Sequence, residues 1–230
     1  AGEGKMLDDR IDSAGNKNQR HLTSWQTGLA GVQMDSLLGG GSTAFSANLT
    51  SGTLTIDDGS TLNNDQSAFG LKTNGGYTKL SMDLSRTQTI YKGLSFFTRA
   101  NGQWADKNLD SAEQLSLGGP SAVRAWQSGE ASGDRGFVYT AELRYLIDKM
   151  GKFPGGFQVF GFVDYGHVVF HSNPLAGSND NTRHLTGAGF GLSWFDSGKY
   201  SARTTVAWKV AGETRPSDSP MVYFQAIKRF

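Results

Sequence analysis

The sequence predicts an all-β fold, and within that class a transmembrane antiparallel β-barrel, from three observations. Apolar and polar residues alternate with a period of two over stretches of ten to sixteen residues, the period of a β-strand. Short turns and long polar segments connect these stretches in alternation. The polar face is rich in charge, and aromatic residues lie near the strand ends of the apolar face, as expected where lipid covers the apolar face and water fills the lumen.

The alternation is clearest in the segment KYSARTTVAWKV. One face carries Tyr200, Ala202, Thr204, Val206, Trp208 and Val210, and the other carries Ser201, Arg203, Thr205 and Lys209. The same pattern predicts nine strands, at residues 20–35, 42–56, 76–90, 93–106, 135–148, 156–171, 184–196, 199–212 and 220–230. Residues 1–19 lack the alternation and are interpreted as a polar surface loop.

The connections predict that the two ends of the sheet differ. Short turns are expected at 36–41, 91–93, 149–155 and 197–199, and longer polar loops at 57–75, 107–134, 172–183 and 213–219. The strands are also longer than the average of about five or six residues in soluble domains. A soluble jelly roll or lectin-like sandwich remains the alternative if alternation is considered alone.

The composition excludes several classes of partner and site. Lys and Arg number 22 against 21 Asp and Glu, so the net charge of +1 favours no nucleic-acid partner. The chain has no cysteine, which excludes a disulfide framework and a thiolate metal site. No apolar run approaches the ~20 residues of a membrane helix, and no residue pattern indicates a cofactor.

Two short motifs carry the most information about function. The longest predicted loop contains GGPSAVRAWQSGEASGDRGF at 118–137, with Val123, Arg124, Ala125 and Trp126 at its centre. The predicted strand at 156–171 contains FGFVDYGHVVF, in which Phe162, Asp164 and Gly166 share one face. That face is the polar one, so Asp164 is expected to point into the lumen.

Together these motifs resemble those of the two-partner secretion translocators, outer-membrane pores related to the barrel-assembly factors. In that family the loop tetrad is Val/Ile-Arg-Gly-Tyr/Phe, and here it is Val123, Arg124, Ala125 and Trp126, with alanine in the place of glycine. The family's strand motif Phe-x-Asp-x-Gly is matched by Phe162, Asp164 and Gly166.

The resemblance implies an architecture for the whole chain. Residues 1–230 would be the C-terminal part of a barrel of sixteen strands, without the periplasmic POTRA domains and the plug helix of the family. Loop 107–134 would fold into the lumen, where Arg124 would meet Asp164. Such a contact is physically reasonable, because a confined carboxylate is costly without a partner and a guanidinium can bind it with two parallel hydrogen bonds.

The resemblance also implies a function. The chain would form part of a pore in the outer membrane of a Gram-negative bacterium, and would export a large partner exoprotein of the adhesin, haemolysin or haem-binding type. Its other partners would be the lipid bilayer and, during insertion, the barrel-assembly machinery. The alternating apolar residues of the last strand fit the signal that this machinery reads: Val222, Phe224, Ala226 and Phe230.

Other functional classes have weaker support. A passive porin or a substrate-specific uptake channel would share the barrel but would not depend on Arg124. An enzyme is not expected, because Ser121 lacks the strand-turn-helix elbow of a nucleophile and has no histidine base.

The segment GAGFG at 187–191 lies in a predicted strand, where its glycines would leave room for the inserted loop. His167 and His171 would lie about 13 Å apart on a strand, too far for one metal ion.

Overall fold

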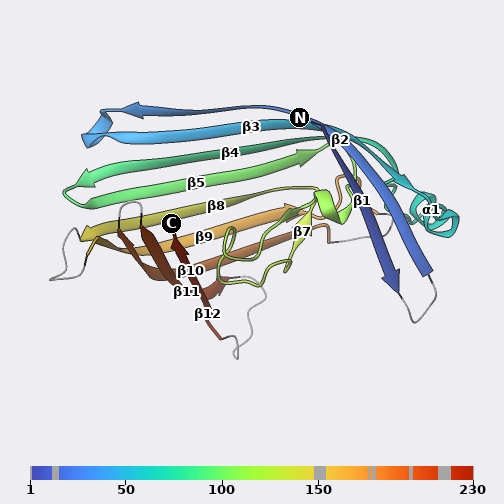
Figure 1. Ribbon diagram of the computed structural model, residues 1–230. Coiled ribbons are helices and arrows are strands. Elements are labelled where there is room, and N and C mark those ends of the chain that lie inside the picture. Colours follow the sequence, from blue (N-terminus) through green and yellow to red (C-terminus); the bar gives the residue numbers. More distant parts are fainter. Residues whose placement is uncertain are drawn as a thin grey trace.

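The computed structural model describes residues 2–11, 16–147, 154–175, 177, 180–196, 199–211 and 219–229. Ten antiparallel strands form one sheet in the order β1-β2-β3-β4-β5-β8-β9-β10-β11-β12, and two short strands, β6 and β7, pair with each other. The large sheet curls into a trough, with β2 to β5 forming one side and β8 to β12 curving below it (Figure 1). Strands that follow one another along the sheet also follow one another in sequence, as in a barrel wall.

The bounds of the strands in the large sheet are β1 Gly2–Ile11, β2 Asn16–Asp35, β3 Gly41–Ile56, β4 Gly75–Tyr91, β5 Leu94–Ala105, β8 Arg135–Ile147, β9 Gly156–Val169, β10 Thr182–Asp196, β11 Tyr200–Ala211 and β12 Met221–Lys228. The nine predicted strands are all present as β2 to β5 and β8 to β12, and most predicted bounds lie within two residues of those observed. The all-β barrel fold class is therefore confirmed.

The prediction for residues 1–19 was wrong, because most of this segment is strand. β1 pairs with the first half of β2, from Gly2 opposite Trp25 to Ile11 opposite Asn16. Pairing between strands is made by backbone groups, so it can extend through a polar segment that shows no alternation. β1 and the adjoining half of β2 bend away from the rest of the sheet (Figure 1), and the sheet has ten strands where nine were predicted.

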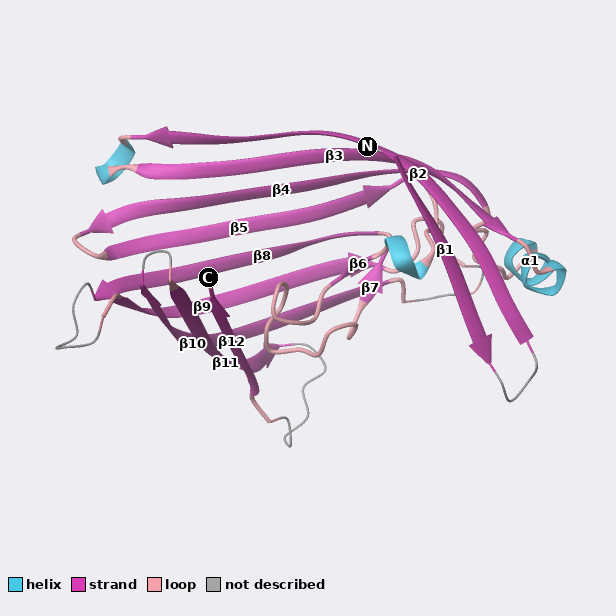
Figure 2. Cartoon of the chain, viewed as in Figure 1, coloured by secondary structure: helices cyan, strands magenta, loops and turns pink. Residues whose placement is uncertain are grey.

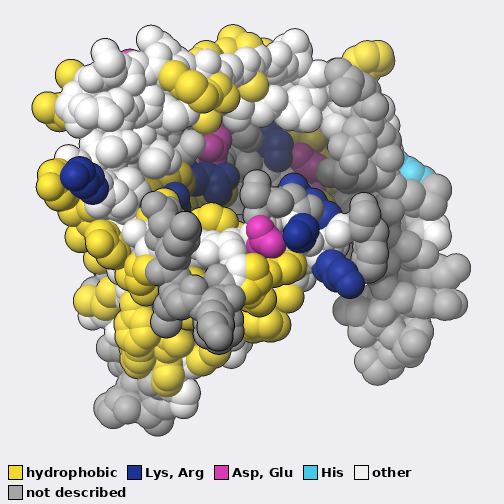
Figure 3. Space-filling view, turned by 60° about the vertical axis from the view of Figure 1, so that its left-hand side comes forward, with side chains coloured by type: hydrophobic (Ala, Val, Ile, Leu, Met, Phe, Trp, Pro, Cys, Tyr) yellow, Lys and Arg dark blue, Asp and Glu magenta, His cyan; other side chains and the backbone are white. Residues whose placement is uncertain are grey.

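The two faces of the sheet differ as the alternation predicts. Apolar side chains stand on the outer face, including Leu29, Phe45, Met82, Leu84, Phe190, Trp208 and Val210, each at least 40% exposed. Basic and acidic side chains gather inside the hollow, while apolar side chains cover much of the outside (Figure 3). This arrangement is the reverse of a soluble sandwich and matches a barrel wall with lipid outside and a polar lumen.

Helical structure is confined to the connections, and Figure 2 shows it at the ends of the sheet. The helix α1, Gly59–Gln66, lies in the loop between β3 and β4, where the sequence analysis predicted no helix. Asp58 begins it by accepting a hydrogen bond of 2.7 Å from the Thr61 amide, and hydrogen bonds from Ser60 and Thr61 lower the pKa of Asp58 to about 2. No helix in the described ranges is long and apolar enough to cross a membrane.

The connection between β5 and β8, loop 107–134, lies against the concave face of the sheet (Figure 1). It contains the 3-10 helix η2, Ser111–Glu113, and the paired strands β6, Leu115–Ser116, and β7, Ser132–Gly133. One buried apolar cluster forms around the loop's middle and another around its first residues. The loop therefore has a core of its own inside the trough.

The assignment of the two faces predicts different responses to a buried charge. Leu84→Arg places a guanidinium on the outer face of β4 and should reduce the stability of the inserted barrel by about 2–4 kcal/mol. The adjacent change Ser85→Arg faces the lumen and should be mild. Urea titration of the refolded protein in lipid vesicles measures both, and equal losses would contradict the assignment.

Candidate functional site

The tip of the loop, residues 117–131, is held in shape by its own backbone. The Leu117 amide donates to the Ala131 carbonyl at 2.9 Å, and the Val123 amide donates to the Leu117 carbonyl at 2.8 Å. The Gly119 amide donates to the Trp126 carbonyl at 2.9 Å. These bonds close the chain on itself, so the tetrad that begins at Val123 is presented as one rigid unit.

The lumen face of the sheet is organised in rows that run across the strands. Thr140 of β8, Asp164 of β9 and Gly187 of β10 lie opposite one another in register. In the next row Glu142 lies beside Phe162, and Gly189 follows it. Since residues opposite one another share a face of the sheet, the two rows place two carboxylates and two glycines under the loop tip.

Arg124 binds Asp164 through three hydrogen bonds. Its Nε donates to Oδ2 at 2.8 Å, its Nη2 donates to Oδ1 at 2.8 Å, and its backbone amide donates to Oδ2 at 3.1 Å. Thr140 Oγ1 also donates to Asp164 Oδ1 at 2.9 Å. The Arg124 guanidinium lies over the Phe162 ring, and its Cζ atom is 3.4 Å from the ring centroid. The structure thus brings together the arginine of the loop and the motif residues of β9.

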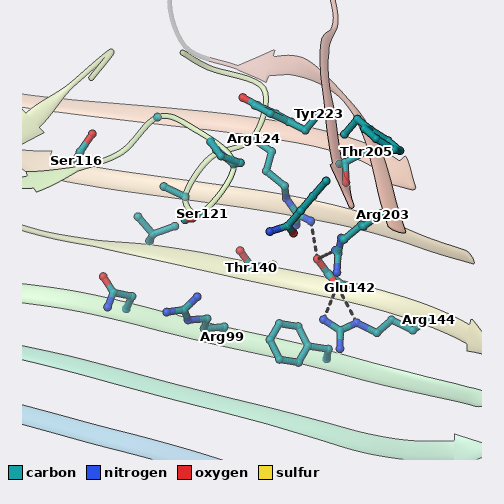
Figure 4. Close-up of a pocket in the computed structure, with 18 residues that line it drawn as sticks. Arg99, Ser116, Ser121, Arg124, Thr140, Glu142, Arg144, Arg203, Thr205 and Tyr223 are labelled. Carbon is teal, nitrogen blue, oxygen red and sulfur yellow. Dashed lines mark hydrogen bonds and ion pairs between the residues drawn. The ribbon is translucent and has the colours of Figure 1, made fainter. Parts of the chain in front are cut away.

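The same guanidinium binds a second carboxylate, that of Glu142. Arg124 Nη1 donates to Glu142 Oε1 at 2.6 Å, and Arg144 binds Glu142 Oε2 through Nε at 2.8 Å and Nη2 at 2.6 Å. Arg203 of β11 adds a longer contact of 3.4 Å to Oε1. Figure 4 shows the three arginines converging on Glu142, so three guanidinium groups surround two carboxylates.

The centre of this network is buried, although the Arg203 side chain is 38% exposed. Arg124 is 6% exposed, Glu142 is 3% exposed and Asp164 is fully buried. Burial would lower the pKa of the Arg124 guanidinium, but hydrogen bonds and charge from Asp164, and then from Glu142, outweigh it and raise the pKa above its usual value. Arg124 is therefore charged, and its removal would leave buried carboxylates without this partner.

Gly166, the last residue of the β9 motif, makes room for the loop. A Cβ atom at this position would lie 2.9 Å from Leu117 Cδ2 and 2.9 Å from Val123 Cγ2. Both side chains are fully buried. Any side chain here would displace the tip, so glycine is required by packing.

Ala125, which replaces the family's glycine, packs closely on β10. A Cβ atom at Gly187 would lie 2.6 Å from the Ala125 Cβ. Ala125 has no positive φ angle, so its backbone does not require glycine. Trp126 completes the tetrad: it is 1% exposed, and its Nε1 donates to the Thr186 carbonyl at 3.1 Å. The tip is thus fixed against both β9 and β10.

The prediction that all three glycines of β10 make room for the loop was only partly right. Gly187 contacts the loop, whereas a Cβ atom at Gly189 would lie 2.6 Å from Phe162 Cζ. Gly191 likewise faces the ring of Phe160, which lies under the guanidinium of Arg203 at 4.0 Å. The second and third glycines therefore accommodate the aromatic rings that support the arginines.

The tip, β8 and the last strands border a cavity of about 880 Å³. Arg99, Arg144, Arg203 and Tyr223 line it from the sheet, and Ser121 lines it from the loop. Figure 4 shows these side chains around the cavity. It is polar on the sheet side, as expected for a segment of an aqueous lumen.

Of the residues assigned to the assembly signal, Phe224 is on β12, is 72% exposed and lies at the border of this cavity. Phe230 lies outside the described residues. Phe224 makes no contact with Arg124, Glu142 or Asp164 among the hydrogen bonds and ion pairs described above.

The sequence analysis did not single out Glu142 and Arg203 as site residues. The signal was present in the alternation, because Thr140, Glu142 and Arg144 share the lumen face of the strand that precedes the motif strand. Their meeting with Arg203 depends on the curvature of the sheet, which brings β11 towards β8 across two intervening strands.

The close packing of Ala125 on Gly187 generates a prediction. Gly187→Ala should destabilise the seated tip by about 1–3 kcal/mol through overpacking, and the second change Ala125→Gly should restore most of the loss. Peptide mapping of tryptic cleavage after Arg124, which is 6% exposed, measures how often the tip is unseated. If Ala125→Gly gave no recovery, the two residues would not be in contact.

Comparison with known proteins was made on the sequence and on the fold. A family model described as haemolysin secretion/activation protein ShlB/FhaC/HecB matches residues 10–194. The chain is 29% identical over 224 residues to the heme/hemopexin transporter protein HuxB of Haemophilus influenzae strain 86-028NP, covering 97% of this chain and 39% of that protein. It is 24% identical over 135 residues to the outer membrane transporter CdiB of Dickeya dadantii strain 3937, covering 59% of this chain and 23% of that protein.

The fold matches a solved structure of CdiB from Escherichia coli with a TM-score of 0.61 and 20% sequence identity. The match covers 98% of this chain and 49% of that chain, and it shows a shared barrel fold. The chain spans 39% of the length of the HuxB relative.

Proposed function

The chain belongs to the haemolysin secretion/activation family of ShlB, FhaC and HecB, and from this premise we propose that it forms part of the pore through which a partner exoprotein crosses the outer membrane. It is an outer-membrane protein of a Gram-negative bacterium and belongs among the two-partner secretion translocators. Its relatives are named as a heme/hemopexin transporter and as an outer membrane transporter, and the proposal specifies an exported protein as the substrate class.

The observation that carries the proposal is the loop tip seated on the lumen face by Arg124. A pore that passes a polypeptide needs a polar lumen, and a loop that occupies this lumen controls the space available. The tip is closed by its own backbone hydrogen bonds and lies inside the trough (Figure 1). We therefore assign loop 107–134 as the inserted lumen loop of the translocator, with Val123, Arg124, Ala125 and Trp126 as its functional motif and Phe162, Asp164 and Gly166 as the partner motif.

The charges around the tip suit a contact that can open and close. When the tip leaves, Glu142 keeps the two hydrogen bonds from Arg144, at 2.8 and 2.6 Å. Asp164 keeps the Thr140 hydroxyl and becomes accessible to lumen water. Neither carboxylate is then left in a dry environment, so the cost of release is moderated. The phenylalanine rings and the glycines remain in place as a seat for the tip's return.

Replacing Arg124 tests the proposal directly. In the full-length protein with its exoprotein, Arg124→Ala should leave the barrel folded, because β-strand pairing does not involve this side chain, and should reduce export at least about tenfold. Loss of one member of a buried charge pair costs about 3–5 kcal/mol, and less where water enters. Export is measured as exoprotein in the medium, and folding as heat-modifiable migration of the barrel.

Controls and a double change sharpen this test. Arg99→Ala removes a lumen arginine whose partner is Asp83, at 2.7 Å, and should leave export near the wild-type level. Asp164→Ala should reproduce the defect of Arg124→Ala, and the double variant should be no worse than either, because both remove one contact. Additive losses would mean that the two residues act separately.

The alternative is a passive porin or a substrate-specific uptake channel. A porin also has a polar lumen, but its conductance does not require a particular loop arginine to be paired. If removing the whole protein left export intact, and Arg124→Ala changed only ion conductance, the channel alternative would replace translocation. The packing of a complete tetrad on Gly166 and Gly187 favours translocation, because a solvated loop would not need such close approach.

The proposal fixes an orientation. The long connections at 57–75, 107–134, 172–183 and 213–219 should lie on the cell-surface side, and the short turns should lie in the periplasm. Because the chain has no cysteine, a single thiol can report location. A thiol introduced by Asn64→Cys should react with an impermeant maleimide on intact cells, and one introduced by Gly39→Cys should not; the reverse result would invert the topology.

A further inference from the structure

The loop is also held at its base, by residues on either side of the tip that carries Arg124. The residues that lead into and out of the tip carry three buried carboxylates, which have different partners: Asp110 and Glu113, each 6% exposed, and Asp134, fully buried. We call this group the base cluster. It shares no residue with the network around Arg124.

Two of these carboxylates form ion pairs with the first strands of the sheet. Asp110 pairs with Arg20 of β2. Glu113 Oε2 pairs with Lys79 Nζ of β4 at 2.8 Å, with the two side chains 6% and 14% exposed. Lys79 Nζ also donates to the Glu113 carbonyl at 3.0 Å, as does Gln103 Nε2 at 3.0 Å. The entering half of the loop is thereby bonded to β2, β4 and β5.

Asp134 joins the two halves of the loop to the next connection. Its Oδ1 accepts from the Leu109 amide at 3.1 Å and from Gln114 Nε2 at 2.9 Å, and its Oδ2 accepts from the Ser172 amide at 2.8 Å. Both carboxylate oxygens are used, and none of these donors is charged. An asparagine would offer one acceptor where two are needed, so the site fits a carboxylate specifically.

Asn108 extends the cluster to the connection before β4 and adds contacts to the connection after β9. Its Nδ2 donates to the Leu71 carbonyl at 2.8 Å and to the Asn173 carbonyl at 3.0 Å, while its Oδ1 accepts from the Asn173 amide at 2.7 Å. Leu109 beside it is 4% exposed in an apolar cluster with Leu22, Leu54, Ile56, Tyr77 and Ala105. The base is thus tied by polar and apolar contacts to strands on both sides of the trough.

We propose that the base cluster positions the loop independently of Arg124, as a fixed pivot from which only the tip is released during export. This inference rests on the proposed role of the loop, but the two holding points can be examined without export. At the tip, the charged partners of Glu142 remain after release. At the base, release would leave the Asp134 carboxylate without its neutral donors in a buried place, which is costlier. Asp110, Glu113 and Asp134 are positioning residues in this scheme.

Thiol accessibility distinguishes the two holding points in the full-length protein in outer membranes. Val123→Cys reports on the tip and Leu109→Cys on the base, since both parent residues are buried. Asp134→Asn should raise the maleimide reaction rate at the base reporter about tenfold, as for local opening of a weakened segment, and should change the tip reporter little. Asp164→Asn should do the opposite.

Further variants separate positioning from general damage. Lys79→Glu places a second carboxylate beside that of Glu113, and the repulsion should expose the base reporter. Adding Glu113→Lys restores an ion pair and should restore much of the protection of that reporter. Asp83→Asn is the matched control, because Asp83 bonds Arg99 and Asn101 on the wall, and it should move neither reporter. If Asp134→Asn prevents folding, the Lys79→Glu variant and its Glu113→Lys partner still test whether weakening the base exposes the base reporter without exposing the tip reporter. The proposal is overturned if both reporters always respond together, or if the base reporter responds to none of the base variants.

Discussion

The structure around the lumen depends on the pairing of one buried guanidinium with two carboxylates from neighbouring strands. Arg124 satisfies Asp164 with two side-chain bonds of 2.8 Å and Glu142 with one of 2.6 Å. Because buried charges are tolerated only when paired, the register of β8 against β9 has to bring both carboxylates under the loop. That register places Thr140 opposite Asp164 and Glu142 opposite Phe162, which supplies the hydroxyl donor and the aromatic surface as well.

The packing of the neighbouring strands follows from this pairing. For the guanidinium to reach the wall, the backbone of the tip has to approach β9 and β10 closely, and glycine stands at the points of approach, Gly166 and Gly187. The remaining glycines of β10 admit the rings of Phe160 and Phe162, over which Arg203 and Arg124 lie. Charge pairing, aromatic support and glycine spacing are therefore parts of one arrangement across β8 to β11.

The sequence predicts the strands and their faces for physical reasons, whereas the meeting of Arg124 with Asp164 was implied by the resemblance of two motifs to those of a known family. A strand with lipid on one side and water on the other has to alternate, so the pattern survives in the sequence. β1 was not predicted because backbone pairing leaves no such pattern, and α1 was not predicted because it is short and lies in a polar connection. The role of Glu142 could not be predicted from the sequence. Its partners come from the loop, from β8 and from β11, and only the curvature of the sheet brings them together.

The tip and the base of the loop differ in the partners that their carboxylates keep after release. At the tip, Glu142 is shared among three arginines, so losing Arg124 leaves it still paired. At the base, the Asp134 carboxylate accepts from the Leu109 and Ser172 amides and from the Gln114 side chain, and all three donors are neutral. A shared carboxylate lowers the cost of release, whereas a carboxylate bonded by neutral donors raises it. The sharing of Glu142 among three arginines therefore favours release at the tip, and the neutral donors of Asp134 favour retention at the base, as the proposed pivot requires.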